Sequence, residues 1–156
     1  MSIFTRINQF EDIPAQLVTS AHDISQRAAF QSADVIIYHF AFYDELFEIM
    51  QNGNGKAFQI VLFHNVTPEE YIAEELRPFV ARSFAQIQHF HHADRLWPFT
   101  QTNAEVLIQA GMDVSRIEIV NPAVPWPPRC LHIQKKLRHL HHQIGNKRSP
   151  KTHKGC

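Results

Sequence analysis

The chain has 156 residues, a hydrophobic content of 44% and a formal net charge of zero, which is the composition of a globular domain. No apolar run reaches the roughly 18 residues that a membrane-spanning helix needs, and the first residues lack the basic and apolar regions of a secretory signal. Cys130 and Cys156 both lie near the C-terminus, so the sequence predicts neither a disulfide framework nor a cysteine metal site. We therefore expect a cytoplasmic protein without a transmembrane segment, and leave open a peripheral contact with membranes.

The charges are distributed unevenly along the chain. Residues 1–128 hold seven Lys and Arg against fifteen Asp and Glu, a net charge of −8, whereas residues 129–156 hold eight bases and no acid, a net charge of +8. We predict two parts: residues 1–124 as a domain, and residues 125–156 as a basic tail that is irregular or weakly helical. The abrupt change motivates the hypothesis that a frameshift or truncation joined unrelated sequence to the domain.

Hydrophobic patterning up to residue 63 predicts helix, strand, helix and strand in turn. Apolar residues recur at helical spacing between residues 13 and 30, so we expect a helix from about Pro14. Residues 35–40 and 58–63 are nearly continuous apolar runs, typical of parallel strands covered on both faces. An amphipathic stretch between them predicts a helix that ends at an Asn-Gly-Asn-Gly turn, residues 52–55. This order is a βαβ unit.

Capping signals organise the second half. Thr67 and Glu70 form a T-x-x-E capping box with Pro68 in the first turn, which predicts a helix directly after residue 63 that Pro78 interrupts. After it we expect a helix over 79–91, a strand over 95–97, a helix capped by Thr102 and Glu105 and ended by Gly111, and a strand over 116–120. The helix over 79–91 carries apolar residues on one inner face: Phe79, Val80, Phe84, Ile87 and Phe90. The pattern predicts an α/β fold, a Rossmann-like parallel sheet with flanking helices.

Polar residues follow the two predicted central strands. His64 and Asn65 end the strand over 58–63, and His39 lies at the end of the strand over 35–40. In open α/β sheets, ligands bind beyond the carboxyl ends of the strands. The sequence therefore predicts a ligand site there, although each histidine taken alone is also explained as a packing residue.

Three segments in succession carry a family resemblance: ADVIIYHF, QIVLFHNVTPEEY and ADRLWPFTQTNAEVLIQAGMDVSRIEIVNPAV. Their order and spacing over residues 30–124 resemble the N-terminal, acceptor-side domain of family 4 (group 1) glycosyltransferases. Those are retaining enzymes of the two-domain GT-B fold that use nucleotide-sugar donors. The resemblance implies a sugar or lipid-linked acceptor, and neither a cofactor nor a metal.

The resemblance also assigns roles to residues. His64 matches the family histidine that contacts the acceptor, and we take it as the candidate catalytic residue. His39, Asn65, Thr100 and Asn121 are the candidate substrate-binding residues, Thr100 at the place of a small hydroxyl residue and Asn121 at the asparagine that enters the interdomain linker. Pro98 and Pro122 depart from the pattern of the family.

Two parts of the parent enzyme are missing from the sequence: the glycine-rich loop after its first strand, and the donor-binding second domain. We therefore expect a fragment that is inactive alone and that requires a separate donor-domain chain. The alternative is a non-enzymatic module that uses its basic tail on anionic membranes or, less favoured because the tail has no aromatic residue, on nucleic acid. The histidines within residues 89–92 do not follow a metallohydrolase order, and we interpret them as structural residues at a helix end.

Overall fold

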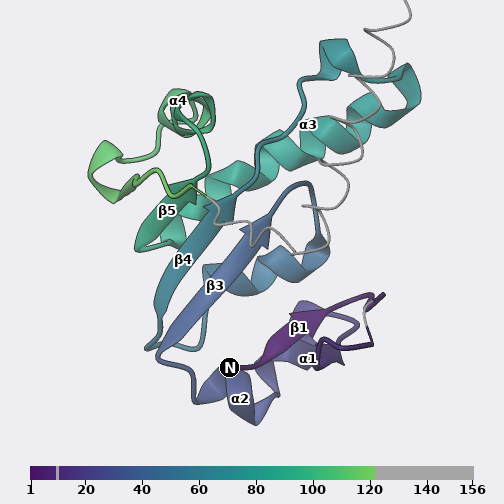
Figure 1. Cartoon of the computed structure of the whole chain (residues 1–156), viewed down its shortest axis with the longest axis vertical. Coiled ribbons are helices and arrows are strands. Elements are labelled where there is room, and N and C mark those ends of the chain that lie inside the picture. The colour runs from purple at the N-terminus through teal and green to yellow at the C-terminus, as the bar shows by residue number, and fades with distance from the viewer. Residues whose placement is uncertain (10, 122–156) are drawn as a thin grey trace, which may run out of the picture. The chain divides into compact units, whose positions relative to one another are not determined.

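The computed structural model describes residues 1–9 and 11–121, and the predictions made for residues 122–156 lie outside this part of the chain. The described part is mixed α/β, with two parallel sheets and flanking helices (Figure 1). Its strands are β1 (Ile3–Thr5), β2 (Ala15–Leu17), β3 (Val35–Phe40), β4 (Phe58–Phe63) and β5 (Arg95–Pro98). Its α-helices are α1 (Ala21–Ser25), α2 (Ala28–Gln31), α3 (Arg77–Gln86) and α4 (Gln101–Gln109). Its 3-10 helices are η1 (Glu45–Gln51), η2 (Glu69–Tyr71), η3 (Glu74–Leu76), η4 (Ile87–His92) and η5 (Val114–Arg116).

The larger sheet has the order β3-β4-β5, and all its strands are parallel. These three strands confirm the predictions for residues 35–40, 58–63 and 95–97. The strand predicted over 116–120 is only partly present, because η5 occupies its start and a single bridge joins Ile117 to Leu96. Two further bonds continue along β5, from Glu118 N to Leu96 O at 2.9 Å and from Val120 N to Pro98 O at 3.0 Å. The chain therefore runs parallel to β5 up to Val120.

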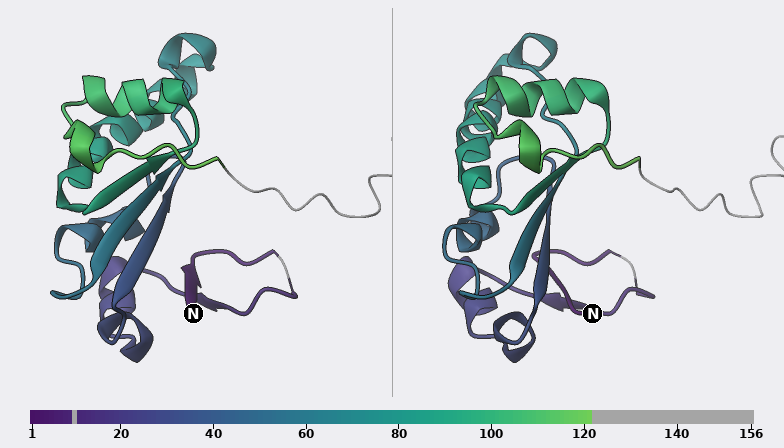
Figure 2. Two further views of the ribbon diagram at one scale, coloured as in Figure 1. Left: turned by 60° about the vertical axis from the view of Figure 1, so that its left-hand side comes forward. Right: turned by 90° about the vertical axis from the view of Figure 1, so that its left-hand side faces the viewer.

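The core lies on one face of this sheet, under η1, α3 and η4 (Figure 2). Five of its buried residues are phenylalanines, and Phe40 contacts Phe47 and Phe90 edge to face at centroid distances of 4.9 and 5.0 Å. Phe63 joins the same cluster at 5.9 Å from Phe90. Each fully buried ring stabilises the fold by about 1.5–3 kcal/mol relative to an exposed one.

The opposite face of β3 is open within the described residues. Val35 and Ile37 are about half exposed, and Phe58, which pairs with Val35 in the next strand, is 42% exposed. The prediction that these strands are covered on both faces was therefore wrong for β3. The sequence of a strand shows how apolar its two faces are. It does not show whether other elements of the chain cover both of them.

The N-terminal segment differs most from the prediction. In place of one helix from Pro14, residues 15–17 form β2, paired in parallel with β1, and two short helices follow. Ser20 begins α1 by accepting a hydrogen bond from Asp23 N at 3.1 Å. Arg27, with extended backbone at ψ 126°, separates α1 from α2. A local cap and an extended residue override the helical spacing.

The region after β4 also departs from the predicted capping box. Asn65 takes a left-handed conformation with φ +87°, the chain continues extended, and no helix begins at Thr67. The single-turn helices η2 and η3 precede α3, which starts at Arg77 with Pro78 in its first turn. Pro78 therefore begins a helix instead of interrupting one, because a first-turn residue needs no N–H partner. The amphipathic stretch after β3 forms the 3-10 helix η1.

The inner face of α3 is polar as well as apolar. Phe79 and Phe84, predicted to face inward, are 40% and 37% exposed, whereas Ser83 and Gln86 are buried. Ser83 Oγ accepts from Tyr43 N at 2.8 Å. The Gln86 carboxamide accepts from Asp44 N at 3.0 Å and donates to Asp44 O at 2.8 Å. These two side chains fix the loop that follows β3.

Candidate functional site

His39 and His64 lie side by side at the carboxyl edge of the larger sheet. His39 is the second-last residue of β3 and His64 directly follows β4, where His64 N donates to Phe40 O at 2.9 Å. The side-chain atoms His64 Nε2 and His39 Nδ1 are 3.4 Å apart, and the ring centroids are 5.6 Å apart. The two candidate histidines are therefore brought into contact although 24 residues separate them in sequence.

The register of the sheet explains why both rings point the same way. His39 pairs with Leu62, and Leu62 pairs with Trp97. Because side chains alternate between faces along a strand, His39, His64 and Phe99 share the open face. Phe99 contacts His64 edge to face at a centroid distance of 4.5 Å. The sheet and this ring together hold His64 in place.

Partial desolvation favours the neutral form of both imidazoles, although both histidines are exposed residues. Desolvation lowers the pKa of His39 below the ordinary value of 6.5. Desolvation also lowers the pKa of His64, and a charge on His39 lowers it further. A neutral imidazole has one N–H donor and one acceptor nitrogen. One donor and one acceptor are used between the rings, so the pair presents one donor and one acceptor to a ligand.

Asn65 lies beside this pair in a conformation that few residues adopt. Its φ of +87° is in the left-handed region, which asparagine tolerates better than most residues. Its Oδ1 is buried and has no hydrogen-bond partner within the described part of the chain. Unusual backbone conformations and unpaired buried acceptors are more frequent at functional sites. Asn65 therefore remains a candidate ligand-binding residue.

Thr100 and Asn121 lie at the same edge, farther along the sheet. Thr100 is the N-cap of α4, since its Oγ1 accepts from Asn103 N at 3.1 Å, and the predicted cap at Thr102 was wrong. Ile117 pairs with Leu96, so the same register places Asn121 level with Thr100. Both residues are exposed. The structure thus gathers all five candidates at one edge, and only His39 and His64 are shown in contact.

Sequence reasoning missed Ser83 and Gln86. It interpreted Phe99 as a core or cleft-edge aromatic, and strand alternation is the signal that places Phe99 beside His64, because Phe99 follows β5 as His64 follows β4. Ser83 and Gln86 are polar residues on an otherwise apolar helix face, and a hydrophobic pattern assigns such residues to solvent.

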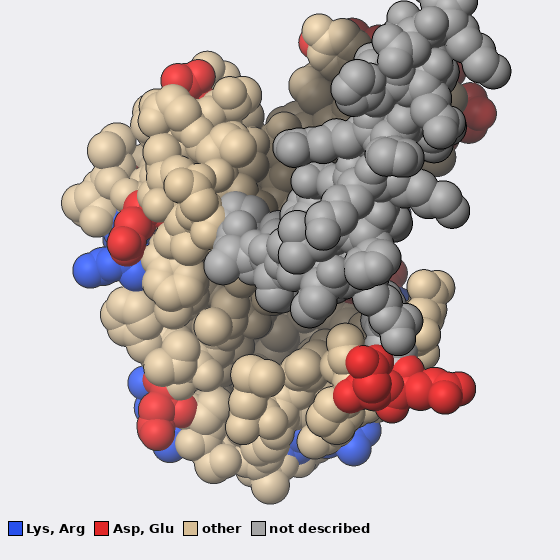
Figure 3. All heavy atoms as spheres, viewed as in Figure 1, with Lys and Arg blue, Asp and Glu red and all other residues tan. Residues whose placement is uncertain are grey.

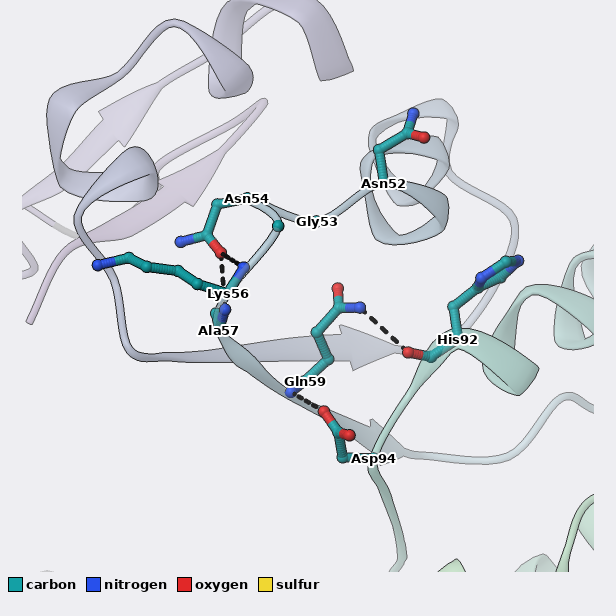
Figure 4. A pocket seen from close by; sticks show the side chains of 9 residues that line it. Asn52, Gly53, Asn54, Lys56, Ala57, Gln59, His92 and Asp94 are labelled. Carbon is teal, nitrogen blue, oxygen red and sulfur yellow. Dashed lines mark hydrogen bonds between the residues drawn. The ribbon is translucent and has the colours of Figure 1, made fainter.

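A hollow of about 280 Å³ lies at the amino ends of β4 and β5 (Figure 4). Several of its polar side chains are engaged in holding the fold. Asn54 Oδ1 accepts from Lys56 N and Ala57 N, and Gln59 bonds to His92 O and to the hydroxyl of Tyr38. We therefore interpret this hollow as structural.

The charged side chains of the described residues do not gather into one large patch on the face drawn in Figure 3. They lie there in small separate groups among neutral side chains. Across residues 1–9 and 11–121, no group of three or more His, Cys, Asp or Glu residues is arranged to hold a metal. His91 and His92 are exposed at the end of η4. None of the helices described is long and apolar enough to cross a membrane.

Comparisons with models of protein families, with curated proteins and with solved structures each returned no match. The resemblance to glycosyltransferases therefore rests on the sequence motifs and stays a prediction.

Proposed function

We propose that this chain is the acceptor-side half of a retaining glycosyltransferase, with a Rossmann-like fold that corresponds to part of a GT-B N-terminal domain. The observation that carries the proposal is the neutral pair of His39 and His64 at the carboxyl edge of the parallel sheet. Sugar hydroxyls both donate and accept hydrogen bonds, so two hydroxyls of one sugar match the one acceptor and one donor that the pair presents. The proposed acceptor is a sugar or a lipid-linked sugar.

In this proposal the two histidines orient the acceptor hydroxyl. One ring nitrogen accepts its proton in a hydrogen bond and leaves the oxygen lone pair free for the anomeric carbon of the donor. The hydroxyl oxygen bonds to the anomeric carbon on the face from which the nucleoside diphosphate departs, as retention requires. The hydroxyl proton passes to the ring nitrogen, and the bond from that carbon to the diphosphate oxygen breaks. The edge-to-face contact of Phe99 limits rotation of the His64 ring. Asn65, Thr100 and Asn121 are proposed to bind other hydroxyls at the same edge.

The donor site is proposed to lie on a separate chain. The sequence has no glycine-rich phosphate loop, and Gly53, Gly55 and Gly111 all take positive φ at turns or helix ends. We accordingly propose that turnover needs a donor-binding partner. We also propose a cytoplasmic location, with peripheral membrane contact left open.

The test is a turnover assay of the full chain mixed with separately produced donor-binding domains, with a nucleotide sugar as donor. We expect turnover only in the mixture, and at least a tenfold lower rate for His64→Ala, since losing one positioned proton acceptor costs about 10²-fold or more. His92→Ala, an exposed histidine on η4, is the matched control and should leave the rate unchanged. Absence of turnover with every partner would reject the activity.

The charge block of residues 129–156 favours a second candidate, a module that binds anionic surfaces. Eight bases without an acid predict binding to anionic vesicles that weakens as salt is added. Removal of residues 129–156 should abolish this binding, and equal binding by the shortened chain would reject it.

A further inference from the structure

The nitrogens of His39 and His64 are spaced like two ligands of one metal ion. His39 Nδ1 and His64 Nε2 are 3.4 Å apart. Zinc binds imidazole nitrogen at about 2.0–2.1 Å in a tetrahedral arrangement, which places two such nitrogens about 3.3–3.4 Å apart. We propose that His39 and His64 together bind a divalent transition metal ion, Zn²⁺ in particular, with water in its remaining positions.

The pair needs little rearrangement to bind a metal. The bond from His64 N to Phe40 O fixes the two backbones, and Phe99 packs against the His64 ring. Both histidines are exposed residues at the end of the sheet, so an ion can reach them. Imidazole is a preferred ligand for Zn²⁺, Cu²⁺ and Ni²⁺. Two protein ligands and exchangeable water make an open site of modest affinity.

Metal binding changes the position of one proton. Between neutral rings, one nitrogen of the 3.4 Å contact carries a hydrogen and the other accepts it. To coordinate the metal, the donating ring moves this proton through solvent to its other nitrogen, which leaves a free lone pair on each of the two facing nitrogens. No net proton is released while both rings are neutral. The metal would use the two facing nitrogens, whereas the proposed acceptor hydroxyl uses the outer ones, and the metal site does not rest on the proposed function.

The test is a Zn²⁺ titration of the full chain, followed by NMR of the histidine ring nitrogens. Five of the eleven histidines and both cysteines lie in residues 129–156, so bulk zinc uptake is not informative and each ring must be observed separately. We expect the signals of His39 Nδ1 and His64 Nε2 to shift together with one common midpoint. His39→Ala should raise the zinc midpoint of His64 at least about tenfold, because a two-nitrogen site becomes a single ligand.

His92→Ala is the matched control and should leave the His64 midpoint unchanged. Circular dichroism of each variant confirms that it is folded. The proposal is overturned if the two rings stay unshifted while other histidines saturate. It is equally overturned if His39→Ala leaves the zinc midpoint of His64 unchanged, since His64 then binds zinc alone.

Discussion

The loop that follows β3 is held by a buried side chain, and Gln86→Leu tests how much that anchor contributes. Gln86 is 3% exposed and bonds to both the N–H and the C=O of Asp44. Leucine has a similar size but no polar atoms, so the variant removes both bonds with little change in packing. Asp44 O keeps its bond from Phe47 N, whereas the bond from Asp44 N to the Gln86 carboxamide has no replacement in the variant.

The magnitude follows from these two losses. An unpaired buried N–H costs about 1–3 kcal/mol, and one lost bond at a carbonyl that keeps another costs about 0.5–1.5 kcal/mol. Because Asp44 is partly exposed and water reaches it, we expect a total loss of about 2 kcal/mol in the free energy of unfolding.

Urea denaturation followed by circular dichroism measures this loss. With a slope of about 1–3 kcal/mol per molar urea, the midpoint should fall by about 1 M. Gln109→Leu, at an exposed position of α4, is the matched control and should change the free energy by less than about 0.5 kcal/mol. A Gln86→Leu variant as stable as this control would refute the anchoring argument.

Three further predictions concern pH, helix capping and a helix end. The pKa values of His39 and His64 are lower in the folded chain than in the unfolded chain. As the pH falls below about 6.5, the unfolded chain therefore binds more protons than the folded chain, and the free energy of unfolding should decrease. Urea midpoints at several pH values test this, and a double alanine variant with an unchanged pH dependence would contradict it. Thr100→Ala should lower the free energy of unfolding by about 1 kcal/mol, and Thr102→Ala by less than about 0.5 kcal/mol, because only Thr100 caps α4. Thermal unfolding compares the two variants, and a larger loss for Thr102→Ala would support the capping box predicted from the sequence. Gly111→Ala should lower the free energy of unfolding by about 1 kcal/mol, because a φ of +86° is strained for alanine. The added Cβ meets no atom within 4 Å beyond its chain neighbours, so steric overlap adds nothing. An unchanged melting temperature would exclude that strain.

The sequence predicted the strands of the larger sheet because long apolar runs are strong local signals. Residues 35–40 and 58–63 carry such runs, residues 95–97 are a shorter stretch after Ala93-Asp94, and the structure places strands at all three. Their parallel order also predicted that His39 and His64 would lie at one edge. Their 3.4 Å contact depends on the register between β3 and β4, which the order of elements does not determine.

The errors arose where several local signals compete. The apolar spacing of residues 13–30 also suits a short strand and two helices separated by Arg27. Thr67 and Thr102 each begin a T-x-x-E motif, but neither caps a helix. The chain stays extended after Asn65, and α4 begins at the N-cap Thr100. Capping motifs identify candidate helix starts, and tertiary packing selects among them.

The measurement that tests the central claim most directly is a titration of the full chain with methyl glycosides of common hexoses, followed by NMR of the histidine rings. The proposal predicts saturable shifts at His39 and His64 that disappear in His64→Ala, while His91 and His92 remain unshifted. Saturable binding that leaves both site histidines unshifted, or no saturable binding of any hexoside, would contradict an acceptor site at this edge of the sheet.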